Sequence, residues 1–144
     1  MKSSAAVLLL VLALAGCGGA VQITPPEPEG AAAAACEKLG GLLPRTLDGA
    51  AKGETTPASP YVAVWGEAEI ALRCGVPRPQ RMAPTDQLSE INGVGWYADP
   101  TTPTLFTAIT GVAYVEVTIA RSHTAPSVLV DLAAPINQAL PQAG

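Results

Sequence analysis

The feature that most constrains this chain is an apolar run near its start, about 11 residues long (5–15), which ends just before Gly16 and Cys17. A secretory signal has an apolar core of about 7–15 residues, whereas a helix that stays in a membrane needs about 18–20. Lys2 supplies the positive charge before the run, and small residues before Cys17 let a peptidase reach the bond. We therefore expect residues 1–16 to be a lipoprotein signal peptide.

Cys17 is then the residue that receives lipid. Two or three acyl chains on one cysteine, palmitate among them, hold a protein stably at a membrane. We expect the protein to be lipid-anchored on the extracytoplasmic face of the cell membrane. Two alternatives remain open: an ordinary secretory signal that leaves Cys17 as a plain thiol, and a buried N-terminal helix, which Gly16, Gly18 and Gly19 would break.

The two remaining cysteines, Cys36 and Cys74, are an even pair in a chain predicted to be exported, where disulfides form and persist. A bond between them would close a loop of about 38 residues and stabilise the fold by roughly 3–4 kcal/mol. Two free buried thiols are the alternative. A metal site would need both cysteines, His123 and a fourth ligand, and the sequence has no closely spaced ligand pair.

The composition describes a weakly charged, acidic chain. Charged residues make up 14% of it, aromatic residues 4%, and the net charge is −4. A poorly basic surface argues against nucleic acid as a partner. The core must therefore be built mainly from aliphatic side chains. The abundance of Ala, Gly and Pro, with Arg favoured over Lys, is typical of a high-GC genome, and we expect an actinomycete source.

The apolar patterns predict one α+β domain at residues 31–144, preceded by a Pro-rich tether at 17–30. We expect a small antiparallel sheet with the N- and C-terminal helices packed on one face. Pro135 is expected to kink or break the second helix. The predicted elements are helices at 30–43 and 127–140, strands at 61–65, 69–74, 93–97, 104–110 and 113–120, loops at 45–60 and 76–84, and a helical turn at 85–91.

Four segments carry a resemblance to a known family: Trp65-Gly66-Glu67, the run from Ile70 to Pro79, Asn92 to Trp96, and Val115 to Thr118. With the early cysteine and the signal, the chain resembles the actinobacterial lipoprotein family called domain of unknown function 3515, over about residues 36 to 140. The run from Ile70 to Pro79 is its most specific part. The resemblance implies an exported, envelope-associated protein, and it supplies no activity and no catalytic residues.

Three arginines are the only local excess of positive charge, and they surround the Pro-rich loop at 76–84: Arg73, Arg78 and Arg81. Guanidinium groups bind carboxylates and phosphates through paired hydrogen bonds, so these residues are candidate ligand-binding residues for a cell-wall polymer or a lipid headgroup. Alternatively, Arg73 pairs with Glu67 or Glu69 on the wet face of its strand, and the other two keep the loop soluble.

The two tryptophans, Trp65 and Trp96, are candidates for a platform on which a sugar stacks. Large aromatic residues at strand ends are more often anchors of the core, which is the alternative. The loop at 76–84 is a candidate partner-binding surface, because its prolines would stiffen it, although such loops also serve as plain connectors.

His123 is the only histidine, and Ser122 and Asp131 lie near it in the sequence. A hydrolase triad needs a nucleophile on a strained turn, usually within Gly-x-Ser-x-Gly, and the sequence lacks that motif. We therefore expect His123 to be a solvated loop residue.

The sequence has no complete catalytic set and no cofactor motif, and we expect no cofactor. The favoured function is a binding or scaffold module at the cell envelope, which engages a cell-wall component or another envelope protein. The alternative is a hydrolase that acts on envelope material and uses surface carboxylates as acid and base: Glu67, Glu69, Asp86 and Glu90.

Overall fold

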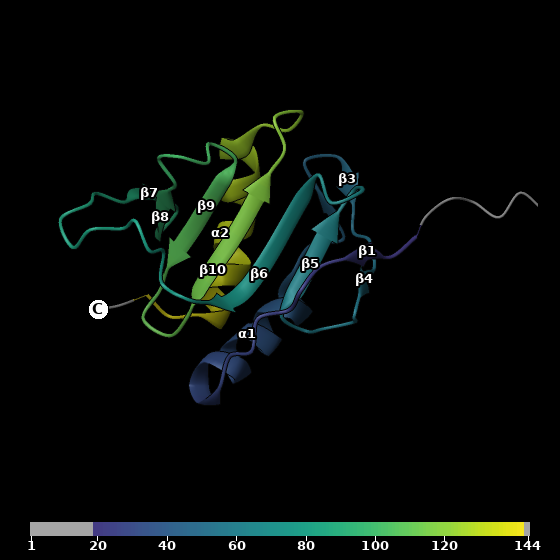
Figure 1. Cartoon of the computed structure of the whole chain (residues 1–144), viewed down its shortest axis with the longest axis horizontal. Coiled ribbons are helices and arrows are strands. Elements are labelled where there is room, and N and C mark those ends of the chain that lie inside the picture. The colour runs from purple at the N-terminus through teal and green to yellow at the C-terminus, as the bar shows by residue number, and fades with distance from the viewer. Residues whose placement is uncertain (1–18, 143–144) are drawn as a thin grey trace, which may run out of the picture.

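The computed structural model describes residues 19–142 and has an α+β architecture with one dominant sheet (Figure 1). All five pairings within the sheet are antiparallel. Its six strands, in spatial order, are β5 (Val62–Trp65), β6 (Ile70–Val76), β10 (Tyr114–Ile119), β9 (Leu105–Ile109), β8 (Val94–Ala98) and β7 (Ser89–Ile91). The two helices are α1 (Gly30–Leu42) and α2 (Ala125–Ala139), and the remaining strands are the pairs β1 (Val21–Gln22) with β4 (Thr55–Thr56) and β2 (Thr46–Leu47) with β3 (Ala50–Ala51).

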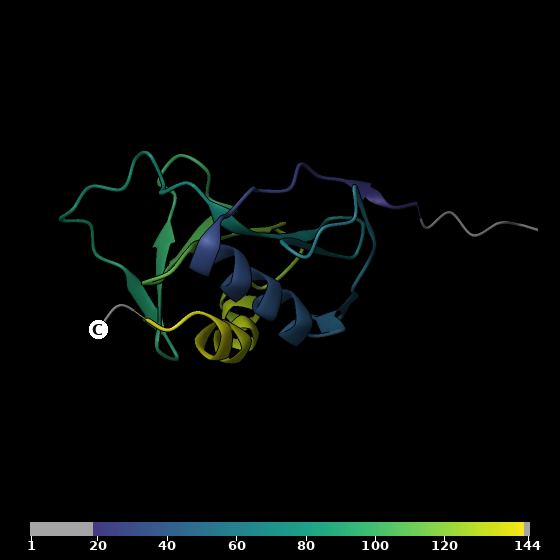
Figure 2. The same ribbon diagram turned by 90° about the horizontal axis from the view of Figure 1, so that it is seen from below.

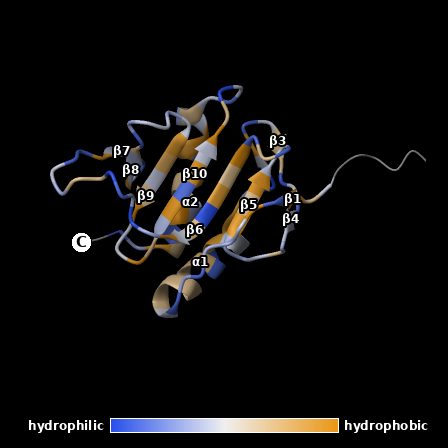
Figure 3. Cartoon of the chain, in the orientation of Figure 1, coloured by the Kyte–Doolittle hydropathy of each residue, from blue (hydrophilic) through white to orange (hydrophobic). Residues whose placement is uncertain are grey.

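Strict alternation of side chains makes β6 the clearest strand of the sheet. Successive residues point to opposite faces. Ile70, Leu72, Cys74 and Val76 are buried, whereas the three residues between them are partly exposed. Strand β10 alternates in the same way, and Figure 3 shows hydrophobic ribbons interrupted by hydrophilic stretches on both strands. Because successive side chains of a strand point to opposite faces, this pattern builds a core on one side of the sheet.

Both helices lie on that side of the sheet (Figure 2). Helix α2 buries a stripe at four-residue spacing that includes Val128, Leu132 and Ile136. Helix α1 packs chiefly against α2 and meets the sheet at β6. There the predicted disulfide is confirmed, because the Sγ atoms of Cys36 and Cys74 are 2.09 Å apart.

Several details differ from the sequence prediction, although the α+β class is confirmed. The sheet has six strands rather than a small number, and α1 leans on α2 instead of lying flat on the sheet. Helix α2 continues through Pro135, which is buried within it. A proline inside a helix costs about 3 kcal/mol, and burial of Leu132, Ala133 and Ile136 around it offsets that cost.

The predicted helical turn at 85–91 is wrong, because residues 89–91 form β7. The carboxylate of Asp86 accepts a hydrogen bond from the backbone N–H of Ala83 at 2.8 Å, which makes a local turn rather than a helix start. Asn92 and Gly93 then turn the chain into β8 with φ angles of 49° and 85°. Asn-Gly is the pair that favours such a hairpin turn.

The segment at 19–29, which we call the strap, does not form the free tether expected of residues 17–30. It crosses the face of the sheet opposite the helices (Figure 2). Strand β1 pairs with β4, and the Arg73 guanidinium donates to the carbonyl of Thr24 at 3.2 Å. Pro26 is buried, and the ring of Pro28 lies against Gly75. The strap is therefore part of the domain, and β6 contacts the core on one face and the strap on the other.

The outer edge of β5 is also occupied. The segment at 51–53, within the predicted loop 45–60, makes a bridge between Lys52 and Trp65. Gly53 donates its N–H to the Val64 carbonyl at 2.9 Å, and Gly66 donates to the Ala51 carbonyl at 2.8 Å. Short strands thus replace an irregular loop, because they satisfy backbone groups that the edge strand would leave unpaired.

The disulfide gives a first prediction. Replacing Cys36 and Cys74 together by alanine should lower the free energy of unfolding by about 3–4 kcal/mol, because the unfolded chain loses the closed loop. Urea denaturation followed by far-UV circular dichroism measures the change. A double variant as stable as the oxidised wild-type protein would contradict it.

Gly75 gives a second prediction, because it has a φ of +92° and a Cβ there would lie 2.6 Å from the Cβ of Pro28. We expect Gly75→Ala to destabilise the domain by more than about 1 kcal/mol and to speed amide hydrogen exchange at Val21 and Ile23. The matched control is Gly41→Ala in α1, where the new Cβ has open space and should stabilise by about 0.5–1 kcal/mol. Unchanged exchange in the strap would count against the role given to Gly75.

Candidate functional site

Trp65 and Trp96 are both in the core, with exposed fractions of 0% and 1%. Neither indole face is open to a sugar, so the predicted stacking platform is wrong and the core-anchor alternative is correct. The two rings differ in their polar atom. Trp65 Nε1 donates to the carbonyl of Pro44 at 2.9 Å, whereas Trp96 Nε1 has no hydrogen-bond partner.

The three candidate arginines lie in different surroundings. Arg73 donates to Glu116 Oε1 at 3.2 Å and to the strap, so its partner is neither Glu67 nor Glu69 as the alternative proposed. Arg78 is exposed in the loop after β6. Arg81 lines a hollow beside β8. The guanidinium of Arg73 therefore holds the sheet and strap together, and of the three only Arg81 lies beside a hollow that could receive a ligand.

A pocket of about 200 Å³ lies between β8, β9 and the first turn of α2, and we call it the apolar pocket. The register pairs Ala98 with Phe106, so both reach the same wall. Small side chains at Ala98 and Ala125 leave the space open between larger ones. The residues that line it are Ser89, Ile91, Trp96, Ala98, Phe106, Ala125, Pro126 and Leu129.

A second hollow of about 360 Å³ adjoins the apolar pocket, and we call it the polar hollow. The two share the side chains of Ser89, Trp96 and Ala98 as lining. Arg81 and Asp86 contribute charges of opposite sign to the polar hollow. One end of the sheet thus presents an apolar and a polar cavity side by side.

Within residues 19–142, two buried side-chain polar atoms have no hydrogen-bond partner, Trp96 Nε1 and the Tyr97 hydroxyl. They belong to consecutive residues of β8, and both residues line the polar hollow. Burial raises the pKa of Tyr97, the nearby Asp86 and Asp99 raise it further, and Arg81 opposes them. A buried polar group without a partner costs about 1–3 kcal/mol, so two in succession mark a site that is not optimised for stability alone.

His123 is not the solvated loop residue expected from the sequence, because its side chain is only 10% exposed. Its Nδ1 lies 3.0 Å from Asp48 Oδ2 and its Nε2 lies 2.5 Å from Glu69 Oε2. Both partners are carboxylates and accept hydrogen bonds, so the arrangement favours the ring with protons on both nitrogens, the imidazolium. The contacts tie the β2–β3 turn and the β5–β6 turn to the start of α2, and we call this group the histidine clasp.

The charges of the histidine clasp shift its titrations in opposite directions. Hydrogen bonds to Glu69 and Asp48 raise the pKa of His123, against a smaller opposing effect of burial. The N–H of Thr124 and the His123 ring lower the pKa of Asp48. Sequence reasoning missed the clasp because Asp48 and Glu69 lie 75 and 54 residues from His123. Both ring nitrogens are engaged, so His123 is not poised to activate Ser122.

The carboxylates considered for a hydrolase occupy different places. Glu69 belongs to the histidine clasp, and Glu67 lines a hollow with Gly53 and Gly66 beside the start of the strap. Asp86 lines the polar hollow, and Glu90 is exposed on β7. The β5–β6 turn and β7 lie toward opposite ends of the sheet (Figure 1), so the structure does not gather these carboxylates into one cleft.

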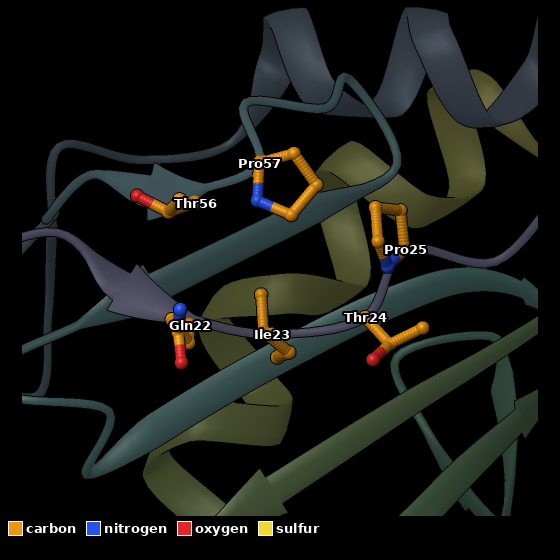
Figure 4. Close-up of a pocket in the computed structure, with 6 residues that line it drawn as sticks. All are labelled: Gln22, Ile23, Thr24, Pro25, Thr56 and Pro57. Atoms are coloured by element: carbon orange, nitrogen blue, oxygen red, sulfur yellow. The ribbon is translucent and has the colours of Figure 1, made fainter.

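A further hollow, of about 400 Å³, lies where the strap runs beside β4 (Figure 4). Figure 4 shows the Pro57 ring on one side of the hollow and the strap residues Ile23 and Thr24 on the other. It offers no charged side chain, and its lining residues are Gln22, Ile23, Thr24, Pro25, Thr56 and Pro57. Within residues 19–142, no group of three His, Cys, Asp or Glu side chains could hold a metal ion, and no helix is long and apolar enough to cross a membrane.

Comparison with known proteins identifies a family but no characterised relative. Residues 3–144 match the model of a family described as "Protein of unknown function (DUF3515)". The match confirms the family to which the sequence analysis pointed, whereas the lipoprotein character and the actinobacterial source stay predictions. No curated protein and no solved structure gives a significant match.

The histidine clasp gives a third prediction. Because the pKa of His123 is raised on folding, its stabilising contribution is complete below the ordinary pKa of about 6.5 and is lost as the pH rises through the folded value. We expect the urea midpoint of the wild-type protein to fall over this interval, and the fall to be absent in His123→Asn. Asp48 acts in the opposite sense, since its lowered pKa gives stability that is lost only as the pH falls through that lowered value.

The matched control for the clasp is Ser122→Ala at the exposed neighbouring position, which should keep the wild-type pH dependence. Parallel midpoint curves for the wild-type protein and His123→Asn between about pH 5 and 9 would show that the clasp does not link stability to protonation.

Proposed function

The chain belongs to the family of proteins of unknown function DUF3515, and we propose that it is an exported, lipid-anchored binding module of the cell envelope. Its partner in this proposal is a cell-wall component or another envelope protein. The observation that carries the binding role is the pair of adjoining cavities at β8, with two buried polar atoms that lack partners.

The cysteines support export and anchoring. Cys36 and Cys74 form a disulfide, a bond that persists in oxidising compartments and is rare in the cytosol. Cys17 lies outside the described residues, directly after the apolar run, and is free to take lipid in this proposal. One cysteine is then used for attachment and two for stability.

The strap would set how the domain stands on the membrane. An extended chain spans at most about 3.3–3.6 Å per residue, so a lipid on Cys17 would hold Gly19 within about 7 Å of the attachment point. The strap begins at one end of the longest axis of the molecule, and β7 and β8 lie at the other (Figure 1). An anchored domain would therefore present the β8 cavities away from the membrane.

A hydrolase is not proposed. General acid–base catalysis needs two groups within reach of one substrate bond, and Glu67, Glu69, Asp86 and Glu90 do not share a cleft. The geometry therefore favours binding over hydrolysis.

The anchor gives a fourth prediction. In a bacterium that lipidates exported proteins, the wild-type chain should take up labelled palmitate and sediment with membranes, because two or more acyl chains hold it there. Cys17→Ala should lose both properties, and Ser4→Ala, a small change in the same segment, should keep them. Membrane-bound, labelled Cys17→Ala protein would contradict the anchor.

The same membranes test the binding role. The wild-type protein, incubated with isolated envelope fractions and with glycan arrays, should enrich at least one glycan or envelope protein reproducibly. Absence of any enrichment from both sources would contradict a binding module, whatever the outcome for Cys17.

A further inference from the structure

We propose that the apolar pocket binds a compact aromatic group that carries one hydrogen-bond acceptor. This inference deepens the proposed binding function and rests on it, but it does not depend on lipid anchoring. It names the part of a ligand that the pocket at β8, β9 and α2 would hold.

The size of the pocket limits the occupant. A water molecule takes about 30 Å³ of liquid, so a volume of about 200 Å³ holds about seven groups of that size. An engineered apolar cavity of about 150 Å³ in another protein binds benzene. A single six-membered ring with one or two further atoms fits this space, whereas the acyl chain of a membrane lipid is too long for it.

The walls of the pocket select an uncharged, flat group. None of the described residues that line it is charged, and Ser89 is the only one with a polar side chain other than Trp96. Trp96 and Phe106 place two aromatic rings in the wall. Aromatic rings attract one another in edge-to-face or offset arrangements beyond the effect of buried area, which favours a ring over an aliphatic chain.

The unpartnered indole N–H of Trp96 selects an acceptor. The residue is 1% exposed, and its Nε1 lacks a partner, whereas Trp65 in the same core donates to Pro44. The low polarity of the surroundings strengthens any hydrogen bond made there. Trp96 lines the pocket, so in this proposal its free donor is the group that an acceptor on a bound ring satisfies, which purely hydrocarbon ligands cannot do.

The polar part of a larger ligand would extend from the apolar pocket into the polar hollow. The apolar pocket and the polar hollow share Ser89, Trp96 and Ala98, so a substituent that leaves the ring would enter the hollow lined by Arg81 and Tyr97. Tyr97, whose hydroxyl is the second buried polar atom without a partner, is one of the residues that line this hollow. The natural ligand is then an aromatic compound with a polar extension.

Two small probes of equal heavy-atom count test the proposal: anisole, which has an ether oxygen, and ethylbenzene, which has none. The full chain carries ¹³C-labelled Ile and Leu methyl groups, and the free probe concentration is measured in each sample. We expect both probes to shift the methyl signals of Leu129 and Ile91, and not those of Leu39 and Ile70 elsewhere in the core. Anisole should bind about fivefold more tightly, because it accepts from Trp96.

Variants separate the two parts of the inference. Trp96→Phe keeps a ring and removes the donor, so it should abolish the preference for anisole. Leu129→Phe should fill the pocket and abolish the shift of Ile91 with both probes, whereas Val130→Phe, at the neighbouring position that is 45% exposed, should keep it. If Leu129→Phe does not fold, Ala125→Leu fills the same space from the edge of the pocket.

Each outcome supports or overturns one stated part of the proposal. Absence of shifts at Leu129 and Ile91 with both probes overturns the pocket as a binding site. Equal affinities for anisole and ethylbenzene overturn the acceptor, and tighter binding of n-hexane than of either probe overturns the aromatic class. Shifts confined to Leu129 and Ile91 in a chain that neither enriches an envelope partner nor takes up lipid would support the pocket and contradict only the proposed function.

Discussion

The Cys36–Cys74 disulfide is the interaction on which the arrangement of the domain depends. It joins α1 to β6 across a sequence separation of 38 residues, and that interval contains β2, β3, β4 and β5. Helix α1 buries few residues, mainly Cys36 and Leu39, and it has no side-chain cap at its start. Such a helix gains little from burying its side chains, so a covalent bond to the sheet compensates for its small share of the core. Strand β6 is therefore constrained on both faces of the sheet, by the disulfide on the face that carries the helices and by the strap on the opposite face.

Elements whose evidence is local were predictable. Strand β10 alternates apolar and polar residues, and α2 repeats apolar residues at four-residue spacing, so both appear close to their expected positions. The strap was not predictable, because its partners Thr55, Arg73 and Gly75 lie far along the sequence and its prolines suggested a solvated linker. Strand β7 is different, since Asn92-Gly93 is a local hairpin signal that outweighs the weak helical pattern before it.

Only some residues of the candidate site could be identified from the sequence. Trp96 lines both cavities, but the sequence does not show that its ring is buried or whether its N–H finds a partner. Tyr97 gave no signal, since a tyrosine within a strand is ordinary until its hydroxyl is found buried and unpaired. Arg81 was identified by charge, but its separation from Arg73 depends on the long loop after β6. A site assembled from β8, β9 and α2 needs the tertiary fold to exist.

The two margins of the six-stranded sheet have a consequence for a protein in a crowded compartment. A bare sheet margin offers unpaired backbone groups to which strands of other molecules can add, and that addition leads to aggregation. Here one margin is β7, which has only three residues, and the other, β5, is already paired in part by the segment at 51–53. Little backbone is left on either margin for an incoming strand. Short or covered margins of this kind disfavour polymerisation of the domain through its sheet.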